Sequence, residues 1–153
     1  MAWKSFFENP VFLSGISSLF FAQLVKTIIH LLRIKRKSFR DTLVLLIWRT
    51  GGMPSSHSSM VAAVAASIAF YEGIDSNLFV ITLMFAMVII RDALGVRRSS
   101  GIHARVLNLL GRQTAEKLKI EFHPVKEVNG HSPLEVAVGV LLGIIIAAAF
   151  SFL

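Results

Sequence analysis

Long apolar segments are the feature that most constrains how this chain can fold. Four of them are present, at 10–32, 60–74, 77–96 and 133–153. A helix rises 1.5 Å per residue, so about 20 apolar residues cross the ~30 Å hydrocarbon core of a bilayer. The first, third and fourth segments have that length, whereas the alanine-rich second segment is shorter and needs its flanking residues. The sequence therefore predicts an integral membrane protein.

Composition agrees with this class and excludes several kinds of site. Hydrophobic residues make up 54% of the 153 positions and charged residues only 16%, whereas a typical soluble domain has about 25% charged residues. The absence of cysteine excludes disulfides, thiol nucleophiles and cysteine-ligated metal sites. The net charge of +7 would suit nucleic acid, but basic residues beside apolar segments are typical of a membrane protein. Nucleic acid is not an expected partner.

The distribution of basic residues predicts the orientation in the membrane. Fourteen of the 16 Lys and Arg residues lie in two stretches, 33–49 and 91–126, whereas the loop 71–77 contains none. The positive-inside rule places both basic stretches in the cytoplasm and hence both termini outside. We expect one all-α integral membrane domain, 1–153, with about four transmembrane helices, in the bacterial inner membrane.

Two shorter segments complete this prediction. Thr42–Trp48 is apolar but too short to span, and it is predicted to be an interfacial or re-entrant piece. The stretch 103–120 mixes apolar and basic positions as an amphipathic helix does. It is expected either on the inner leaflet or as a surface helix in the cytoplasmic loop.

Three polar stretches interrupt the apolar pattern, and the predicted topology brings all three to the cytoplasmic face. They are Gly-Gly-Met-Pro-Ser-Ser-His-Ser (51–58), Arg-Asp-Ala-Leu-Gly-Val-Arg-Arg (91–98) and Lys-Glu-Val-Asn-Gly-His-Ser-Pro-Leu-Glu (126–135). Ionisable residues at membrane depth are costly and indicate function. The motif-bearing part of the chain is therefore 51–153.

The first and third stretches each predict a helix N-terminus with a histidine beside it. Ser55 or Ser56 can cap the first helix, and Ser132 and Glu135 fit a capping box at the second. Helix N-termini bind anions, and His57 and His131 lie at the two ends. The first stretch is equally explained as a cap alone. Glu135 either caps its helix or orients the His131 ring by a hydrogen bond.

The middle stretch supplies positive charge. Arg97 and Arg98 follow the third apolar segment, where they complement the helix dipole or bind phosphate oxygens through their guanidinium groups. Asp92 is expected to pair with Arg91 or Arg97, with a share in a divalent metal site as the alternative. Lys26 and His30, in the first segment, either line a headgroup pocket or, for Lys26, extend to the membrane surface.

These residues resemble a known family. The three motifs, in this order, are similar to those of the divergent acid phosphatase/vanadium-dependent haloperoxidase-related membrane family, a distant branch of the type 2 phosphatidic acid phosphatase superfamily. The resemblance covers Gly51 to the C-terminus. It implies removal of phosphate from membrane lipids, without a metal or other cofactor, through a phosphohistidine intermediate.

The resemblance also implies roles for individual residues. Pro54-Ser-Ser-His57 is similar to a Pro-Ser-Gly-His motif whose histidine protonates the leaving group. His131-x-x-x-Glu135 is similar to a motif whose histidine is the nucleophile and whose carboxylate orients it. The superfamily's Ser-Arg five residues before the nucleophile is absent, since Pro124 and Val125 stand there, and its first motif has no clean match upstream of Gly51. The expected phosphate ligands are Arg97, Arg98, Lys126 and the backbone N–H groups of Ser55 and Ser56.

The sequence thus predicts a phosphatase that acts on a lipid phosphomonoester at the cytoplasmic face, with His131, His57 and Glu135 as its catalytic residues. Phosphatidic acid, phosphatidylglycerophosphate and polyprenyl phosphates remain equally suitable substrates. One alternative keeps the site but uses Mg²⁺ or Ca²⁺ held by Asp92, Glu127 and Glu135. Another is a non-catalytic protein that binds lipid phosphate or serves in assembly.

One further motif concerns packing. Gly139-x-x-x-Gly143 allows close approach of two membrane helices. Its partner is either another helix of this chain or a second copy, which leaves a homo-oligomer open.

Overall fold

The computed structural model of the chain describes residues 2–33, 52–127 and 130–152, which form helices and connecting segments and no strand. The helices are α1 (Ala2–Phe7), α2 (Pro10–Arg33), α4 (Ser56–Glu72), α5 (Asn77–Leu94), α6 (Val96–Leu118) and α7 (Pro133–Phe152). The predicted all-α membrane class is confirmed. The predicted piece Thr42–Trp48 lies outside the described residues.

Three ranges are long and apolar enough to cross a membrane. They are Pro10–Leu32, Asn77–Leu118, which combines α5 with α6, and Pro133–Phe152. The helix α4 has 17 residues and begins at Ser56, because the polar Ser-rich flank extends the short apolar segment as expected. It packs against α2, α5 and α7, so the shortest of the long helices lies at the centre of the bundle.

Side-chain caps and glycines define where these helices begin and end. The Asn9 side chain accepts a hydrogen bond from the Val11 N–H at 2.9 Å. Pro10 is the first residue of α2, where its lack of an N–H costs no helical hydrogen bond. Ser76 caps α5 in the same way, accepting from the Phe79 N–H at 3.1 Å. Gly73 ends α4 at a φ of 88°, which an L side chain rarely adopts.

Small residues hold α4 against its neighbours. A Cβ added to Gly139 of α7 would lie 2.5 Å from the carbonyl oxygen of Ser55, and one added to Gly143 would overlap the backbone at Ser59. On the α2 side, the Ser18 and Ser59 hydroxyls are hydrogen-bonded at 2.6 Å. Close approach with hydroxyl contacts is typical of helices in lipid, where apolar burial gives no driving force. The glycine motif of α7 therefore faces α4 of the same chain.

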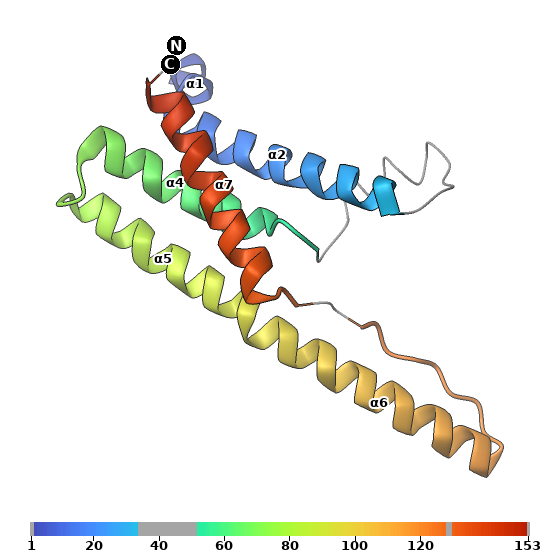
Figure 1. Ribbon diagram of the computed structural model, residues 1–153. Coiled ribbons are helices and arrows are strands. Elements are labelled where there is room, and N and C mark those ends of the chain that lie inside the picture. Colours follow the sequence, from blue (N-terminus) through green and yellow to red (C-terminus); the bar gives the residue numbers. More distant parts are fainter. Residues whose placement is uncertain (1, 34–51, 128–129, 153) are drawn as a thin grey trace.

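The chain alternates in direction, as Figure 1 shows. Helices α2 and α5 run one way, whereas α4 and α7 run the other way, so the first residues of α4 and α7 lie at the same end of the bundle. Both ends of the chain lie at the opposite end. The predicted meeting of the 51–58 and 126–135 stretches is therefore found.

One predicted helix start is wrong. Arg97 and Arg98 follow the third crossing as expected, but they already lie in the first turn of α6. The chain kinks at Gly95, whose N–H bonds to the Arg91 carbonyl at 2.8 Å, and then continues as helix. A single glycine weakens a helix without ending it, and the expected amphipathic helix 103–120 thus begins at Val96.

The helix α6 extends beyond the bundle in nearly the direction of α5, and the segment 119–127 returns alongside it (Figure 1). The Asn108 side chain holds this return. It donates to the Val125 carbonyl at 2.9 Å and accepts from the Val125 N–H at 2.8 Å. This hairpin brings the chain back to His131 at the base of the bundle.

Candidate active site

The first turns of α4 and α7 are joined by a backbone hydrogen bond. The Ser55 N–H donates to the main-chain carbonyl of Glu135 at 2.9 Å. The approach depends on Gly139, because any side chain there would collide with Ser55. Two helix N-termini, with their partial positive charge, therefore meet at one point.

His131 and Glu135 form a hydrogen-bonded pair at this point. The His131 Nδ1 lies 3.0 Å from the Glu135 Oε2, and the His131 residue is only 6% exposed. The His131 main-chain N–H also donates to the Ala93 carbonyl at 3.3 Å, which ties the residue to the end of α5. Since a carboxylate accepts, Nδ1 is the donor in this contact, and the tautomer that carries its only proton on Nδ1 has a lone pair on Nε2.

Glu135 has two functions in this geometry, and the sequence had left them as alternatives. Its Oε2 accepts from the Ser132 N–H at 3.2 Å, and its own N–H donates to the Ser132 hydroxyl at 3.3 Å. This is the reciprocal capping box. The same oxygen also contacts the His131 ring. The capping box therefore holds the Glu135 carboxylate in place, and the carboxylate in turn orients the imidazole.

A basic cavity of about 310 Å³ opens on one side of this pair, and we call it the arginine cavity. Its lining consists of Arg98, Gly101, Ile102, Arg105, Gly130, His131, Ser132 and Glu135. Arg98 and Arg105 are two helical turns apart on α6, so they share one face. Gly130 passes so close to Arg98 that a Cβ would overlap its backbone.

A second cavity, of about 250 Å³, lies on the other side of Glu135, and we call it the lysine cavity. It is lined by Lys26, Ile29, His30, Gly52, Met53, Ser132, Leu134 and Glu135. Lys26 is 4% exposed and lines this cavity together with His30, as expected if the two residues form a headgroup pocket. The two cavities share Ser132 and Glu135, which places cationic side chains of α2 and α6 on opposite sides of the first turn of α7.

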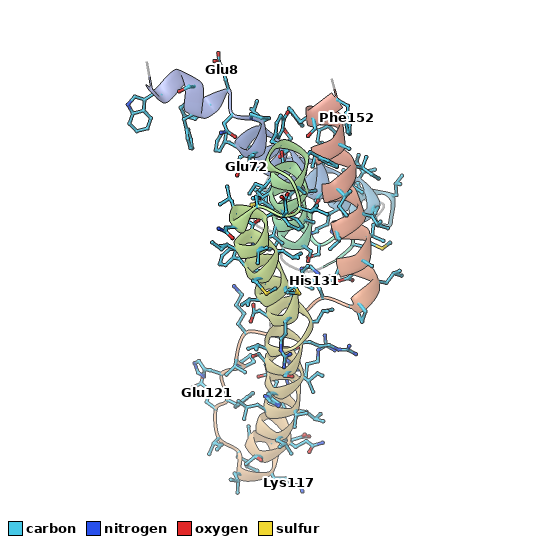
Figure 2. The ribbon with its side chains drawn as sticks, turned by 90° about the vertical axis from the view of Figure 1, so that its left-hand side faces the viewer. Glu8, Glu72, Lys117, Glu121, His131 and Phe152 are labelled. Carbon is cyan, nitrogen blue, oxygen red and sulfur yellow. The ribbon has the colours of Figure 1, made fainter. Side chains whose placement is uncertain are left out.

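Figure 2 places this site within the molecule. His131 lies at the base of α7, where α5 passes into α6. Glu72 and Phe152 lie at the opposite end of the bundle, Lys117 lies at the far tip of the α6 hairpin, and Glu121 lies on the segment that returns from it. The chemistry-bearing residues are therefore concentrated at one end of the bundle, close to the root of the hairpin.

Several predicted phosphate ligands are not where the sequence suggested. The Ser55 N–H is already bonded to Glu135 and the Ser55 hydroxyl accepts from the Ser58 N–H, so Ser55 is a structural cap and not part of an anion cradle. Ser56 is buried in the first turn of α4. Lys126 is exposed on the returning segment and lines neither cavity. The side chain of Arg97 lies outside the described part of the structure.

The carboxylates of the metal alternative are also apart. Glu127 accepts from Asn108 at 3.0 Å and pairs with Arg105 at 3.4 Å, on the hairpin. Asp92 lies in the last turn of α5, and only Glu135 lines the cavities. Among the described residues, no three His, Asp or Glu side chains are grouped to hold a metal ion.

His57 lies in the first turn of α4 and is exposed. It lines neither cavity, although Ser55, two residues earlier, touches Glu135. Two residues correspond to about 200° around a helix, so His57 lies on the side of α4 that faces away from α7. The structure thus brings together Glu135, His131 and Arg98, with His57 in the first turn of α4 on the side away from α7.

Arg105 is the site residue that sequence reasoning missed. Its spacing of seven residues from Arg98 was the available signal, because that spacing repeats a helix face. Such a signal needs one continuous helix through this stretch, and the expected helix began only at His103.

Sequence comparison relates this chain to a known family and to a curated protein. The model of a family described as "Divergent PAP2 family" matches residues 7–146. A curated relative, "Uncharacterized membrane protein YuiD" of Bacillus subtilis (strain 168), is 35% identical over 157 residues, which cover 94% of this chain and 95% of the relative. No solved structure matches.

Proposed function

Because the chain belongs to the divergent PAP2 family, we propose that it is a membrane phosphatase that hydrolyses a lipid phosphomonoester with His131 as nucleophile. The observation that carries this proposal is the contact of 3.0 Å between His131 Nδ1 and Glu135 Oε2, beside a cavity lined by two arginines. An oriented imidazole beside fixed cations is the arrangement that phosphoryl transfer to histidine requires.

The first step transfers the phosphoryl group to the ring. The His131 Nε2 lone pair attacks phosphorus, an N–P bond forms, and the P–O bond to the lipid alcohol breaks. Glu135 keeps the proton on Nδ1 and stabilises the positive charge that the ring develops. His57 donates a proton to the departing alcohol oxygen, a general-acid role worth about 10²–10⁴ in rate.

The second step returns the enzyme to its starting state. A water molecule attacks the phosphohistidine with His57, now neutral, accepting its proton. The N–P bond breaks, and inorganic phosphate leaves. The same histidine therefore serves as acid and then as base, as microscopic reversibility requires.

Cationic side chains from two helices offset the charge of the phosphoryl group. Arg98 and Arg105 line the arginine cavity with His131, and guanidinium groups match phosphate oxygens in pairs. Buried Lys26 lines the cavity on the other side of Glu135. We assign the phosphate to the space between these groups, with no metal.

The positive-inside rule supports a cytoplasmic position for this site, because the site lies at the end of the bundle that carries the basic hairpin. The protein would then lie in the inner membrane with both termini outside. Its substrate would be a lipid of the cytoplasmic leaflet, either phosphatidic acid, phosphatidylglycerophosphate or a polyprenyl phosphate.

The test is phosphate release by the detergent-purified protein from these three lipid phosphates, with chelator present. We expect release by the wild type and its loss, by about 10³-fold or more, in His131→Ala. His123→Ala is the matched control, because His123 is exposed on the returning segment and should leave the rate unchanged.

Other outcomes identify the alternatives. Release that requires added Mg²⁺ or Ca²⁺ would favour a metal-assisted reaction over the histidine mechanism. Binding of lipid phosphate that survives His131→Ala, with no release by the wild type in any condition, would favour a binding or assembly protein.

A further inference from the structure

A separate apolar groove runs along α4 on the side away from α7. It has a volume of about 520 Å³ and is lined by side chains of α2, α4 and α5, among them Phe12, Ile16, Met60, Val64, Ile68 and Phe85. Such a volume is in the range of pockets that bind small molecules, about 300–1,000 Å³. Its lining differs from that of the two cavities around Glu135, where most of the lining side chains are polar or charged.

The groove lies between α2 and α5. Both helices are packed on α4, but their backbones do not come close to one another. On the α2 side the contact is close, since a Cβ on Gly15 would lie 2.9 Å from the Val64 side chain. Phe6 and Asn9, from α1 and the turn before α2, close the end that also includes Glu72, far from His131 (Figure 2).

The other end of the groove leads to His57. Val61, Val64 and Ile68 follow His57 at intervals of four, seven and eleven residues, which is the spacing of one helix face. All three line the groove, and Met60, one turn beyond His57, lines it too. The exposed His57 therefore lies on the same face of α4 as these groove-lining residues, about one turn before the first of them.

The reaction geometry relates the groove to the site. In phosphoryl transfer the attacking and leaving atoms are roughly in line with phosphorus. In the proposed reaction His57 protonates the leaving oxygen, so that oxygen lies on the side of α4 that carries His57. Any hydrocarbon attached to that oxygen then emerges on the groove side of α4.

We propose that the α2–α4–α5 groove holds a hydrocarbon chain of the lipid phosphate, with His57 at the boundary between headgroup and chain. The assignment of the chain to the substrate rests on the proposed function. The groove selects for a single long chain, acyl or prenyl, lying along α4. Within a bilayer, apolar contact with protein replaces apolar contact with lipid, so the groove orients the chain more than it increases affinity.

A second copy of this chain is a poorer occupant. The common two-fold interface brings the same patch of both copies together, and two concave grooves facing each other would leave their centres empty. The α2 and α5 side chains that flank the groove are apolar and exposed, as expected of surfaces that contact lipid.

The experiment uses phosphatidic acid with a photoreactive diazirine near the end of one acyl chain, in phosphatidylcholine vesicles containing the full-length protein. Cross-linked residues are mapped by mass spectrometry. We expect labelling concentrated on the groove-lining residues of α2, α4 and α5. Labelling spread evenly over the outward residues of α5 and α7 would show ordinary surrounding lipid and would overturn the proposal.

Variants sharpen the result. Ile16→Trp and Met60→Trp fill the groove and should lower its labelling about tenfold, the effect of a typical overpacked site. Leu141→Trp is the matched control, since Leu141 is 61% exposed on α7 and should leave the labelling unchanged. The wild-type labelling pattern stands as a test even if a groove variant fails to fold.

Comparison with His131→Ala separates the two proposals. This variant should lose phosphate release and keep the groove labelling. Groove labelling without release by the wild type would contradict the phosphatase and retain the groove as a hydrocarbon site. Release by the wild type with even labelling would contradict the groove and retain the phosphatase.

Discussion

The two sides of α4 differ sharply in how they are packed. On the side of α7, glycines meet the backbone at Ser55 and Ser59, and a backbone hydrogen bond joins Ser55 to Glu135. On the side away from α7, valine, isoleucine and methionine side chains line an open groove. The helix α4 therefore has two different faces. The closely packed face positions the site residues of α7, and the open face lines the groove proposed for the hydrocarbon chain.

The largest expected effect concerns the closely packed side. Glu135→Gln keeps the size of the side chain but no longer fixes the proton on His131 Nδ1. We expect the rate of phosphate release to fall by about 10²–10⁴-fold with little change in stability. Glu121→Gln is the control, because Glu121 lies on the returning segment of the hairpin, away from His131. An unchanged rate in Glu135→Gln would contradict this, because it would show that the carboxylate held at the α4–α7 contact does not support the reaction.

Charge around the site provides the next prediction. Arg98→Met and Arg105→Met keep much of the apolar length of the side chain and remove a cation from the arginine cavity. Each should lower the rate of release by about 10²–10³-fold, the usual effect of removing one transition-state donor. Arg112 lies two helical turns beyond Arg105 along α6 and does not line the cavity, so Arg112→Met should have no such effect. Equal losses in all three variants would contradict a local role.

Packing gives a third prediction, measured as thermal unfolding in detergent. Gly139→Leu should destabilise the protein by about 1–3 kcal/mol or more, because a side chain there overlaps the Ser55 backbone. Met60→Leu, on the groove side, should cost less than about 1.5 kcal/mol. Similar losses in both variants would contradict the difference between the two sides of α4.

The smallest effect is expected at the cap of α7. Ser132→Ala removes the acceptor of the Glu135 N–H and should cost about 0.5–2 kcal/mol of stability. The contact between His131 and Glu135 does not pass through the Ser132 hydroxyl, so phosphate release should be largely retained. Thermal unfolding and the release assay, applied to one preparation, check both parts. A loss of release as large as that of Glu135→Gln would assign Ser132 a direct role.

Much of the fold could be predicted because the information is local. Apolar runs defined α2, α5 and α7 to within a few residues. The Ser132–Glu135 spacing predicted the cap, with the contact to His131 as the alternative, and the structure has both. Each of these features depends on residues within one or two helical turns.

The remainder depends on contacts between distant parts of the chain. The sequence assigned the Ser55 N–H to phosphate, but in the structure this N–H donates to the Glu135 carbonyl, which is 80 residues away in the chain. Arg105 lines the arginine cavity and Lys126 does not, because the chain resumes as a helix directly after Gly95 and carries Arg98 and Arg105 on one face of α6. The groove arises from the separation of the α2 and α5 backbones, which no local pattern encodes.

The measurement that tests the central claim most directly is the search for a phosphorylated histidine after rapid quenching of turnover on a lipid phosphate. We predict an acid-labile phosphate on His131 in the wild type, which accumulates in His57→Ala when the lipid carries a good leaving group that needs no proton. No phosphohistidine at His131 in a preparation that releases phosphate would contradict the account.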